Sequence, residues 1–537
     1  MSGMVERWRT STWAALAVPL LVMVGCQEEE PANRLAVVLV VDQLTPDLLE
    51  RYDSAFEGGF RRLLDAGVYF PNAIHDHAVT YTSPGHASLS TGVHPARHGV
   101  VSNSWREQMQ GEWGGVSSVE DPEARTVGGS GGGNSPHRLV VDGLPDWLLE
   151  QSPESRVVSV SGKSTAAVLM AARARGHVYW YSTGAGGFVT SDHYRSQLPA
   201  WVEEVNARSA TLLPADQCWR AELLPGVAAL SRPDTVPYEF DGVHTFLPHC
   251  VGDEPYDRLP QLVAQSPFLD VLTLELARQA VRSLDLGGRG VPDYLSVALS
   301  STDRVGHRYG PYGREQLENL IQLDGELDAF LAFLDETLGE EGYMVVLASD
   351  HGVLPMPEYL QEQGLPGRRV SGSGAALREV AADALGIESD FAEGELLQLL
   401  GPDERERLAR AMEELDWVEE AYTLEELAGD APGSERGEFL ELYRRSYHPG
   451  RLSSRLSLYG VELRLSEGIL TGGSQTTHGA PYVHDRGVPL LLVGTGISSG
   501  VRQEVVRTVD VAPTLAALMG IEVPVEIDGI ALPGVLD

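Results

Sequence analysis

The sequence contains few cysteines and few basic residues. Three cysteines in 537 residues, with no paired C-x-x-C, exclude a disulfide-rich scaffold and a zinc-finger module. Forty Lys and Arg residues stand against 77 Asp and Glu residues, which gives a formal net charge of −37. A surface of that charge repels polyanions, so we do not expect a nucleic acid polymer as a partner.

The remaining composition is that of a globular protein. It is 43% hydrophobic and 22% charged, which excludes a disordered or fibrous chain. The length would accommodate several domains or one large α/β unit with insertions. The acidity does not exclude small anionic substrates, because bound metal ions can reverse the sign of the field at a site.

The first 26 residues have the layout of an export signal. Arg7 and Arg9 precede an apolar run from Trp13 to Val24 that is too short to span a bilayer comfortably. Gly25-Cys26 follows and resembles a bacterial lipobox, so we expect a signal peptide over 1–26 and a lipidated Cys26. A plain cleaved signal and a single anchor helix are the alternatives.

Residues 27–34 then form a tether, and the mature protein is exported. We expect a bacterial protein that is periplasmic or anchored as a lipoprotein, meets the membrane only through its lipid, and is a monomer. Without Cys26, an even pair of cysteines remains, Cys218 and Cys250. In an oxidising compartment the two either form a disulfide or remain free, and the sequence does not decide between these states.

Five short apolar runs predict strands of a buried sheet. They cover residues 35–41, 157–160, 294–299, 343–348 and 488–493. Unbroken runs of aliphatic and β-branched residues are typical of strands that are buried on both faces, as in a parallel sheet. Helical patterns lie between them, one from Ser266-Pro267 to about Ser283 and one from Arg314 to Leu338.

The predicted class is therefore α/β, with a mostly parallel central sheet and helices on both faces. We expect one catalytic domain over residues 35–537 with two capping insertions. The first, at about 195–260, is Pro-rich and irregular, and the second, at about 373–450, is typical of acidic amphipathic helices. Ligands of such sheets bind beyond the carboxyl ends of the strands.

Six residues with potential metal-binding side chains are predicted at one edge of this sheet, five of them after an apolar run and His478 in the segment Thr476–Gly479. A lone Asp after a strand is usually a cap or turn residue, but three carboxylates and three imidazoles at one sheet edge predict a metal centre. Mixed Asp and His ligands suit Zn²⁺ or Mn²⁺, and two ions need about six protein ligands when a substrate completes each shell. The candidate ligands are Asp42, Asp303, His307, Asp350, His351 and His478.

The segment Thr80–Gly92 contains a candidate nucleophile. Pro84 suits the first turn of a helix, which would make Thr82 or Ser83 its cap residue. A hydroxyl group there faces the free N–H groups of the helix, a natural position for a phosphate-bearing nucleophile. The alternative is an ordinary cap. The neighbouring histidines are expected to be structural; they are His75, His77, His94 and His98.

Gly162-Lys163-Ser164 resembles the end of a nucleotide-binding P-loop, G-x-x-x-x-G-K-[ST]. The first glycine of that motif would fall at position 157, where Val157 belongs to a predicted strand. Because the phosphate cradle needs that glycine, we exclude a P-loop.

Taken together, these motifs resemble the alkaline phosphatase superfamily, and within it the PafA-type periplasmic phosphatases with a threonine nucleophile. The resemblance covers nearly all of the mature chain and implies the fold of that superfamily. The matching segments, in order, are Val40–Gln43, Thr80–His86, His98–Trp105, Ser301–His307, Ser349–Gly352, Thr477–Tyr482 and Thr508–Leu518.

The resemblance also implies roles for individual residues. One zinc would be held by Asp42, Asp350 and His351, with Thr82 bound to it, and a second zinc by Asp303, His307 and His478. Asn103 and Lys163 match residues that contact the transferred phosphoryl oxygens. The implied activity is hydrolysis of small phosphate monoesters through a phosphothreonine intermediate.

One position departs from the family pattern. PafA-type enzymes have an arginine two residues after the lysine, and here that position is Thr165. A bidentate contact to a phosphate dianion is then missing unless Arg173, Arg175 or a loop arginine replaces it. We therefore expect a weaker preference for monoesters than in the full PafA pattern.

Three other functions compete with this prediction. A sulfatase would need a Cys or Ser that becomes formylglycine, and Thr82 cannot form that aldehyde. A phosphodiesterase of the nucleotide pyrophosphatase type shares the metal ligands, the threonine and the asparagine, and is the main alternative. A metal-dependent binding lipoprotein would be expected to have lost the nucleophile or a ligand, whereas none is missing here.

Overall fold

The apolar run Leu35–Val41 forms strand β1 at the centre of the largest sheet. All seven of its residues are buried, and they alternate between two separate apolar cores. Leu35, Val37 and Leu39 pack into one core, and Ala36 and Val38 pack into the other. Because successive side chains of a strand point to opposite faces, this run needed apolar residues at every position.

The computed structural model describes residues 3, 34–109, 112–221, 223–388, 400–429, 437–453, 460–524 and 526–535. Apart from residue 3, the predicted signal peptide with Cys26 lies outside this range, and so does the tether except for its last residue. From residue 32 onward the chain forms one compact unit. None of the helices within the described residues combines the length and apolar character that a membrane-spanning helix needs.

The main sheet has twelve strands. In spatial order they are β20 (Gly500–Val501), β2 (Val68–Ile74), β19 (Gly487–Val493), β13 (Tyr343–Ala348), β1, β12 (Asp293–Leu299), β7 (Val157–Ser161), β8 (His177–Ser182), β9 (Gly187–Ser191), β5 (Glu120–Val127) and β6 (Gly132–Asn134), with β21 (Val506–Arg507) paired to β2.

The five predicted strands all lie in this sheet, but one of them runs in the opposite direction. Strands β13, β1, β12, β7 and β8 run parallel to one another. Strand β19, the run predicted over 488–493, is antiparallel to both β13 and β2. A strand buried on both faces has the same apolar pattern in either direction, so its sequence could not reveal this orientation.

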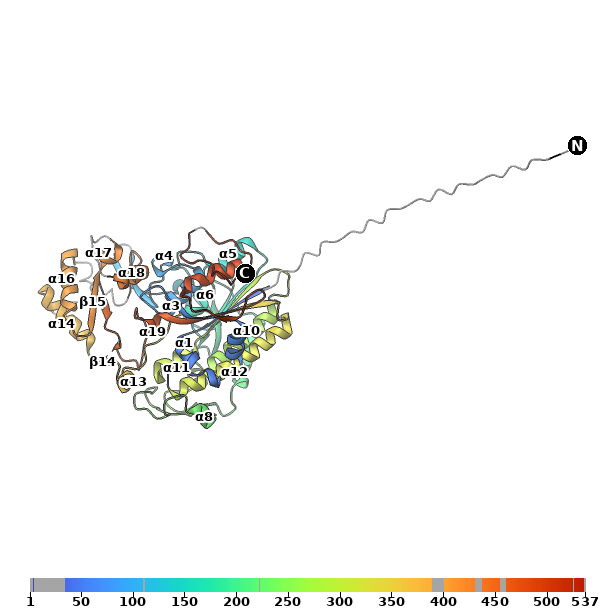
Figure 1. Cartoon of the computed structure of the whole chain (residues 1–537), viewed down its shortest axis with the longest axis horizontal. Coiled ribbons are helices and arrows are strands. Elements are labelled where there is room, and N and C mark those ends of the chain that lie inside the picture. The colour runs from blue at the N-terminus through green and yellow to red at the C-terminus, as the bar shows by residue number, and fades with distance from the viewer. Residues whose placement is uncertain are drawn as a thin grey trace. The chain divides into compact units, whose positions relative to one another are not determined.

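Helices cover both faces of the sheet, which confirms the α/β class (Figure 1). One layer consists of α1 (Pro46–Arg51), α2 (Gly59–Ala66), α7 (Ala200–Arg208), α10 (Phe268–Leu284), α11 (Ser301–Tyr309) and α12 (Arg314–Leu338). The other layer consists of α3 (Thr82–Thr91), α5 (Leu144–Gln151), α6 (Ser164–Met170) and α20 (Val511–Leu518). The two helices predicted around 267–283 and over 314–338 are α10 and α12.

Residues 195–260 contain only short elements besides α7. Strands β10 (Cys218–Trp219) and β11 (His249–Cys250) pair, and a disulfide joins Cys218 to Cys250. The sequence had left the state of these two cysteines open. The helices of this segment are α8 (Pro225–Ala228) and α9 (Leu259–Val263).

Residues 373–450 contain the expected helices and also a strand. The helices are α14 (Ser373–Leu385), α16 (Pro402–Met412), α17 (Leu424–Ala428) and α18 (Gly437–Ser446). Strand β15 (Val418–Thr423) pairs with β17 (Val461–Leu465), and α14 and α16 pack with them around an apolar core of their own. Residues 389–399 and 430–436 of this segment lie outside the described range.

The remaining short elements lie in the connections. Three strands form one small sheet, β16 (Arg451–Ser453), β3 (Ser104–Met109) and β4 (Glu112–Ser117), and β14 (Arg368–Val370) pairs with β18 (Ile469–Thr471). The short helices are α4 (Pro95–His98), α13 (Pro357–Glu362) and α19 (Val483–Arg486).

Candidate active site

The candidate residues converge at the carboxyl ends of the central parallel strands. Asp42 follows β1 directly, and Asp350 follows β13 with one residue between them. Lys163 follows β7 at the same edge, and α11, which begins two residues after β12, carries Asp303. Parallel neighbours end at one edge of a sheet, so four distant segments bring their polar side chains together there.

Asp303, His307 and His478 form one group of potential metal ligands. One ligand atom from each residue lies within 4.8 Å of the others. Nε2 of His307 is 3.1 Å from Oδ1 of Asp303, and Nε2 of His478 is 3.7 Å from the same oxygen. The sequence had assigned these three residues to one ion, and the structure brings them together.

A backbone hydrogen bond at Nδ1 fixes the orientation of both histidine rings. His307 Nδ1 bonds to the backbone oxygen of Thr476 at 2.9 Å, and His478 Nδ1 bonds to that of Thr80 at 2.8 Å. A carbonyl can only accept, so each Nδ1 is a donor, and in the neutral form of each ring Nε2 then carries the lone pair. A tautomer fixed in this way is typical of histidines that bind metal ions.

Asp42, Asp303 and His351 form a second such group. Nε2 of His351 is 3.5 Å from Oδ1 of Asp42, and its Nδ1 bonds to the backbone oxygen of Gly352 at 2.9 Å. The sequence had assigned Asp350 rather than Asp303 to this group. Asp350 does lie beside the ring, with Oδ2 at 3.4 Å from His351 Nε2.

The same Asp350 oxygen is 3.2 Å from Nδ1 of His86. Asp303 is therefore the residue common to both groups. Asp350 instead lies between His351 and His86 of α3 and contacts both. In this arrangement the two potential ion positions share a carboxylate.

Lys163 lies between the two carboxylates of these groups. Its Nζ is 2.5 Å from Oδ2 of Asp42 and 2.6 Å from Oδ2 of Asp303. Val157 is inside β7, as expected, so the Gly162-Lys163-Ser164 segment does not form a P-loop. The lysine side chain contacts the carboxylates of Asp42 and Asp303 instead.

Thr82 is the first residue of α3 and reaches the same place. Its Oγ1 is 3.4 Å from Nε2 of His351, and the side chain is buried. The N-cap of α3 is Tyr81, with extended backbone, and not Thr82 or Ser83 as predicted. Pro84 thus stands at the third helical position, where a missing N–H group is also tolerated.

Asn103 is held close to this helix. Its side-chain Oδ1 accepts a hydrogen bond from the backbone N–H of Ser83 at 2.8 Å. That bond fixes the orientation of the amide and leaves its NH₂ group as the free donor end. Ser83 Oγ is also 2.8 Å from Ser118 Oγ, which steadies the first turn of α3.

Neighbouring charges decide the protonation state of these buried groups. Burial opposes charge on Asp303, yet the Lys163 ammonium and His307 hold the pKa of Asp303 well below its usual range. Burial also disfavours the ammonium, but Asp303 and Asp42 raise the pKa of Lys163.

Burial, together with the nearby Asp350 carboxylate, raises the pKa of Asp42. Burial lowers the pKa of both His351 and His478, which keeps their imidazoles neutral. Neutral imidazoles and carboxylates are the forms in which these side chains bind metal ions, so the neutral His351 and His478 and the anionic Asp303 fit divalent cations as donors.

Gln43 was not identified as a site residue from the sequence. Its Nε2 donates to Oδ1 of Asp303 at 2.9 Å, and its backbone N–H donates to Oδ1 of Asp350 at 3.3 Å. Its φ of 71° is in the left-handed region, unusual for a residue other than glycine. The only sequence signal was its place directly after Asp42.

A second signal in the sequence had been overlooked. Lys163 is the only lysine among the 40 basic residues, since all the others are arginine. A chain that uses arginine at every other basic position but keeps one ammonium beside two buried carboxylates indicates a requirement for lysine there.

The four histidines that were expected to be structural do not belong to any group of metal-binding side chains within the described residues. His75 Nε2 bonds to the backbone oxygen of Ser349 at 3.0 Å, and its Nδ1 lies 2.9 Å from Thr508 Oγ1. His98 is buried and contacts Ser88 through Nε2 at 3.2 Å.

The arginines considered as substitutes at position 165 are not part of this cluster. Arg173 and Arg175 are exposed, and Arg173 pairs with Asp142 at 3.2 Å. Arg304, which follows Asp303 in α11, is half-buried and acts electrostatically on Lys163.

Comparisons with known proteins agree with this geometry. The family described as Type I phosphodiesterase / nucleotide pyrophosphatase matches residues 36–461. The alkaline phosphatase PafA of Elizabethkingia meningoseptica is 30% identical over 525 residues, which cover 94% of each chain.

Solved structures give the same result. The crystal structure of wild-type PafA superposes with a TM-score of 0.83 at 27% identity, covering 94% of this chain and 99% of that one. A PafA variant with a threonine, an asparagine, a lysine and an arginine replaced gives a TM-score of 0.85 with the same identity and coverage. The chain belongs to the Type I phosphodiesterase / nucleotide pyrophosphatase family and is a metal-dependent phosphoesterase.

Proposed function

We propose that the protein hydrolyses small phosphate monoesters through a phosphothreonine intermediate on Thr82 at a site that binds two Zn²⁺ ions. The observation that carries this proposal is the position of the Thr82 hydroxyl. It lies at the positive end of α3, 3.4 Å from a histidine of the candidate metal groups. The alkaline phosphatases among the relatives support the reaction class.

The two zinc positions would use residues of the two groups described above, with Asp350 in place of the shared Asp303 at the second position. His307 and His478 with Asp303 would hold one ion, and Asp42 and His351 with Asp350 the other. The ions, when bound, would lower the pKa of the attacking hydroxyl and stabilise the departing oxygen. Gln43 would orient the carboxylates of Asp303 and Asp350 through its two hydrogen bonds.

The chemistry at the protein side chains then takes two steps. Thr82 Oγ1 attacks phosphorus, the bond to the leaving oxygen breaks, and that oxygen takes a proton to become the alcohol. Water next attacks the phosphothreonine and releases phosphate, which restores the hydroxyl of Thr82.

The Asn103 amide and Lys163 would hold the phosphoryl oxygens during both steps. The Lys163 ammonium has three N–H donors, of which two contact Asp42 and Asp303, so one remains for a phosphoryl oxygen. In PafA, the variant of known structure replaces a threonine, an asparagine, a lysine and an arginine. Three of these residue types gather at this site, and Thr165 stands where the family pattern has arginine.

Thr165 is the specific observation that favours a second function. A phosphate monoester has one more negative charge than a diester, and a missing guanidinium removes part of the compensation for that charge. The family description includes phosphodiesterases. A phosphodiesterase activity at the same threonine is therefore the alternative.

One paired assay separates these functions. The zinc-loaded mature protein would be tested on p-nitrophenyl phosphate and on bis-p-nitrophenyl phosphate, alongside Thr82→Ala. We expect faster monoester turnover and a loss on the order of 10⁴-fold in kcat in the variant, as for removal of a nucleophile. Faster turnover of the diester would support the phosphodiesterase. Activity on either substrate that survives in Thr82→Ala would refute the covalent intermediate.

The effect of position 165 can be measured in the same assay. Thr165→Arg is expected to raise kcat/KM for the monoester about tenfold relative to the diester, because one charge-assisted contact is gained. Thr165→Gln is the control of similar length without charge. If the ratio is the same in all three proteins, Thr165 does not set specificity, and Arg304 becomes the guanidinium to test.

We also propose that the mature protein is exported and is attached to a membrane through a lipid on Cys26. The order of Arg7, the apolar run and Gly25-Cys26 supports this. The disulfide between Cys218 and Cys250 suits an oxidising compartment. Metabolic labelling with a radioactive fatty acid would show whether Cys26→Ser abolishes lipid attachment.

A further inference from the structure

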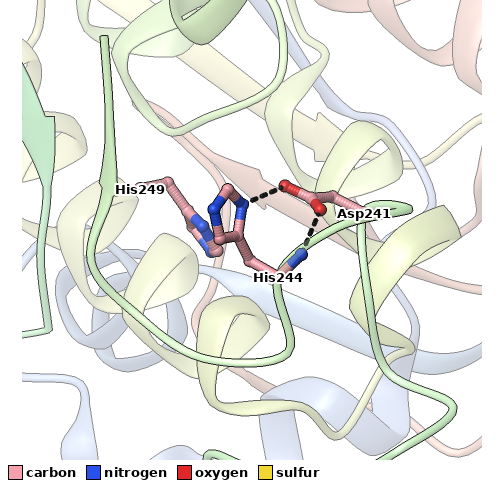
Figure 2. A group of neighbouring side chains, drawn as sticks. All are labelled: Asp241, His244 and His249. Carbon is pink, nitrogen blue, oxygen red and sulfur yellow. Dashed lines mark hydrogen bonds and ion pairs between the residues drawn. The ribbon is translucent and has the colours of Figure 1, made fainter. Parts of the chain in front are cut away.

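A second cluster of potential metal ligands lies outside the candidate active site. It consists of Asp241, His244 and His249, whose carboxylate and imidazole ligand atoms all lie within 4.8 Å of one another. Figure 2 shows the three side chains close together, with the Asp241 carboxylate joined to the ring and to the backbone nitrogen of His244. His249 belongs to the short strand β11. The cluster shares no residue with the active-site groups.

His249 has no hydrogen-bond partner that accounts for its position. Its side chain has 0% exposure, and neither ring nitrogen makes a hydrogen bond in the structure as described. The ring is packed between aromatic neighbours. It is stacked on Tyr309, with the ring centroids 5.3 Å apart, and tilted against Trp219, with the ring centroids 5.2 Å apart. Buried polar atoms are usually satisfied, so a buried imidazole without a hydrogen bond points to a ligand at this position.

Asp241 and His244 are held in a geometry that suits chelation. Oδ1 of Asp241 accepts hydrogen bonds from the backbone N–H groups of Val243 at 2.8 Å and His244 at 2.7 Å. Oδ2 of the same carboxylate lies 3.3 Å from Nδ1 of His244. Gly242, with φ of 105°, makes the turn that brings the two side chains to the same side.

The charges around the cluster favour a cation overall. Asp241 is anionic, because backbone hydrogen bonds outweigh its burial and hold its pKa below the usual value. Burial lowers the pKa of His249; the Asp234 carboxylate acts against this effect and the Arg308 guanidinium adds to it. The carboxyl group of Glu315 has Oε1 at 3.4 Å from Nε2 of His249, and that oxygen makes no hydrogen bond among the described residues. Burial raises the pKa of Glu315 to about 8, so a bound cation would have to displace its proton.

We propose that Asp241, His244 and His249 bind a Zn²⁺ ion, with Glu315 within reach as a fourth ligand. Two imidazoles and one or two carboxylates form a tetrahedral donor set that zinc prefers. His249 belongs to strand β11, Asp241 and His244 lie in the loop before it, and the His244 side chain is 22% exposed, so the cluster is open to solvent on that side.

This ion would join the 195–260 segment to the helix that carries the active-site histidine. The backbone N–H of Phe240 donates to the backbone oxygen of Arg308 at 3.0 Å, and His249 stacks on Tyr309. Both contacts are made with the last turn of α11, which also carries His307. The role we assign to the site is structural, because no described contact connects it with Thr82.

The test is a count of zinc per chain in the full mature protein. Wild type, Asp241→Asn, His244→Ala and His137→Ala would be saturated with Zn²⁺, dialysed and measured by atomic absorption. We expect wild type to hold one more zinc per chain than Asp241→Asn or His244→Ala. His137 is exposed and lies outside the cluster, so His137→Ala should match wild type.

A thermal unfolding series gives the second measurement. Stepwise addition of Zn²⁺ should raise the Tm of wild type further than that of His244→Ala. Asp241→Asn keeps an oxygen for both backbone hydrogen bonds, so it decides the question if His244→Ala does not fold. Equal zinc content in wild type and Asp241→Asn would overturn the proposal, and so would an equal rise in Tm.

The result does not depend on the proposed phosphatase activity. The difference of one zinc is measured between proteins that share the same active-site residues. If the chain hydrolysed neither test substrate, the difference in zinc content would still confirm or refute this site.

Discussion

At the scale of single residues, Lys163 shows how much depends on the kind of positive charge. One ammonium contacts two buried carboxylates, with Nζ 2.5 Å from Asp42 and 2.6 Å from Asp303. Lysine is a compact point charge with freely arranged donors, whereas the guanidinium of arginine is planar and wider. All other Lys and Arg positions of the chain are arginine, and we infer that the lysine at this position is required for its geometry and not for its charge alone.

Replacing this lysine with arginine tests that interpretation. We expect Lys163→Arg to lower kcat/KM for the preferred substrate by about 10- to 100-fold although the charge is kept, because the planar guanidinium does not fit between the carboxylates of Asp42 and Asp303. Arg173→Lys, on the exposed side of the region after α6, is the matched control and should leave the rate unchanged. Comparable rates in Lys163→Arg and wild type would show that only the charge matters.

The residue scale also shows what the sequence could and could not predict about the site. The six ligand candidates, Thr82 and Lys163 were visible, because each follows an apolar run or sits in a compact motif. The contacts of Gln43 were not, since a glutamine after an aspartate has no distinctive pattern. The grouping of Asp303 with Asp42 and His351 depends on side-chain directions that spacing does not encode.

At the scale of elements, α3 is positioned by close packing on the strand end that precedes the site. A Cβ atom on Gly85 would come within 2.1 Å of the backbone oxygen of Asp350. Only glycine permits this approach, and it sets the distance between Thr82 and His351. From the other side, Ser446 Oγ of α18 accepts from the backbone N–H groups of Ala78 at 2.9 Å and Val79 at 3.1 Å.

These packing relations explain which elements the sequence predicted. Strands and long helices were predictable from apolar periodicity, because burial on one or two faces leaves a direct pattern. The direction of β19 was not, and neither was β15 within a segment that reads as helical. The partner strands of both are distant in the sequence, and long-range pairing decides their structure.

Two helical glycines provide a matched pair of substitutions. Gly85→Ala is expected to push α3 away from Asp350 and to reduce kcat/KM on the order of 100-fold, the cost of a displacement of about 1 Å. Gly325, in α12, has open space where a Cβ atom would stand. Gly325→Ala should therefore leave the rate unchanged and raise the free energy of unfolding by about 0.5–1 kcal/mol.

Steady-state kinetics and urea unfolding of both variants would check this prediction. An active Gly85→Ala protein with wild-type kinetics would show that the close approach of α3 is not required. A destabilised Gly325→Ala protein would contradict the open space around that position.

At the scale of the whole molecule, buried ionisable groups near the edge of the sheet make the stability of the fold depend on pH. His75 follows β2 and bonds to Ser349, next to Asp350, and to Thr508. Burial lowers the pKa of His75 to about 4. Buried acids act in the opposite direction, since burial raises the pKa of Asp270 to about 7. The pH profile of the wild-type protein therefore mixes contributions of both signs.

A comparison of wild type with His75→Gln isolates the contribution of His75 to this pH profile. The unfolded chain binds a proton at His75 below about pH 6.5, whereas the folded protein binds it only near pH 4. The contribution of His75 to the free energy of unfolding is therefore complete above about pH 6.5 and falls as the pH is lowered. Between pH 7.5 and pH 5 the difference in unfolding free energy between wild type and variant should shrink by about 2 kcal/mol. Urea unfolding in the presence of a chelator removes the effect of metal loss. A difference that stays constant over this range would mean that His75 is not held neutral by the fold, and that its two hydrogen bonds survive protonation.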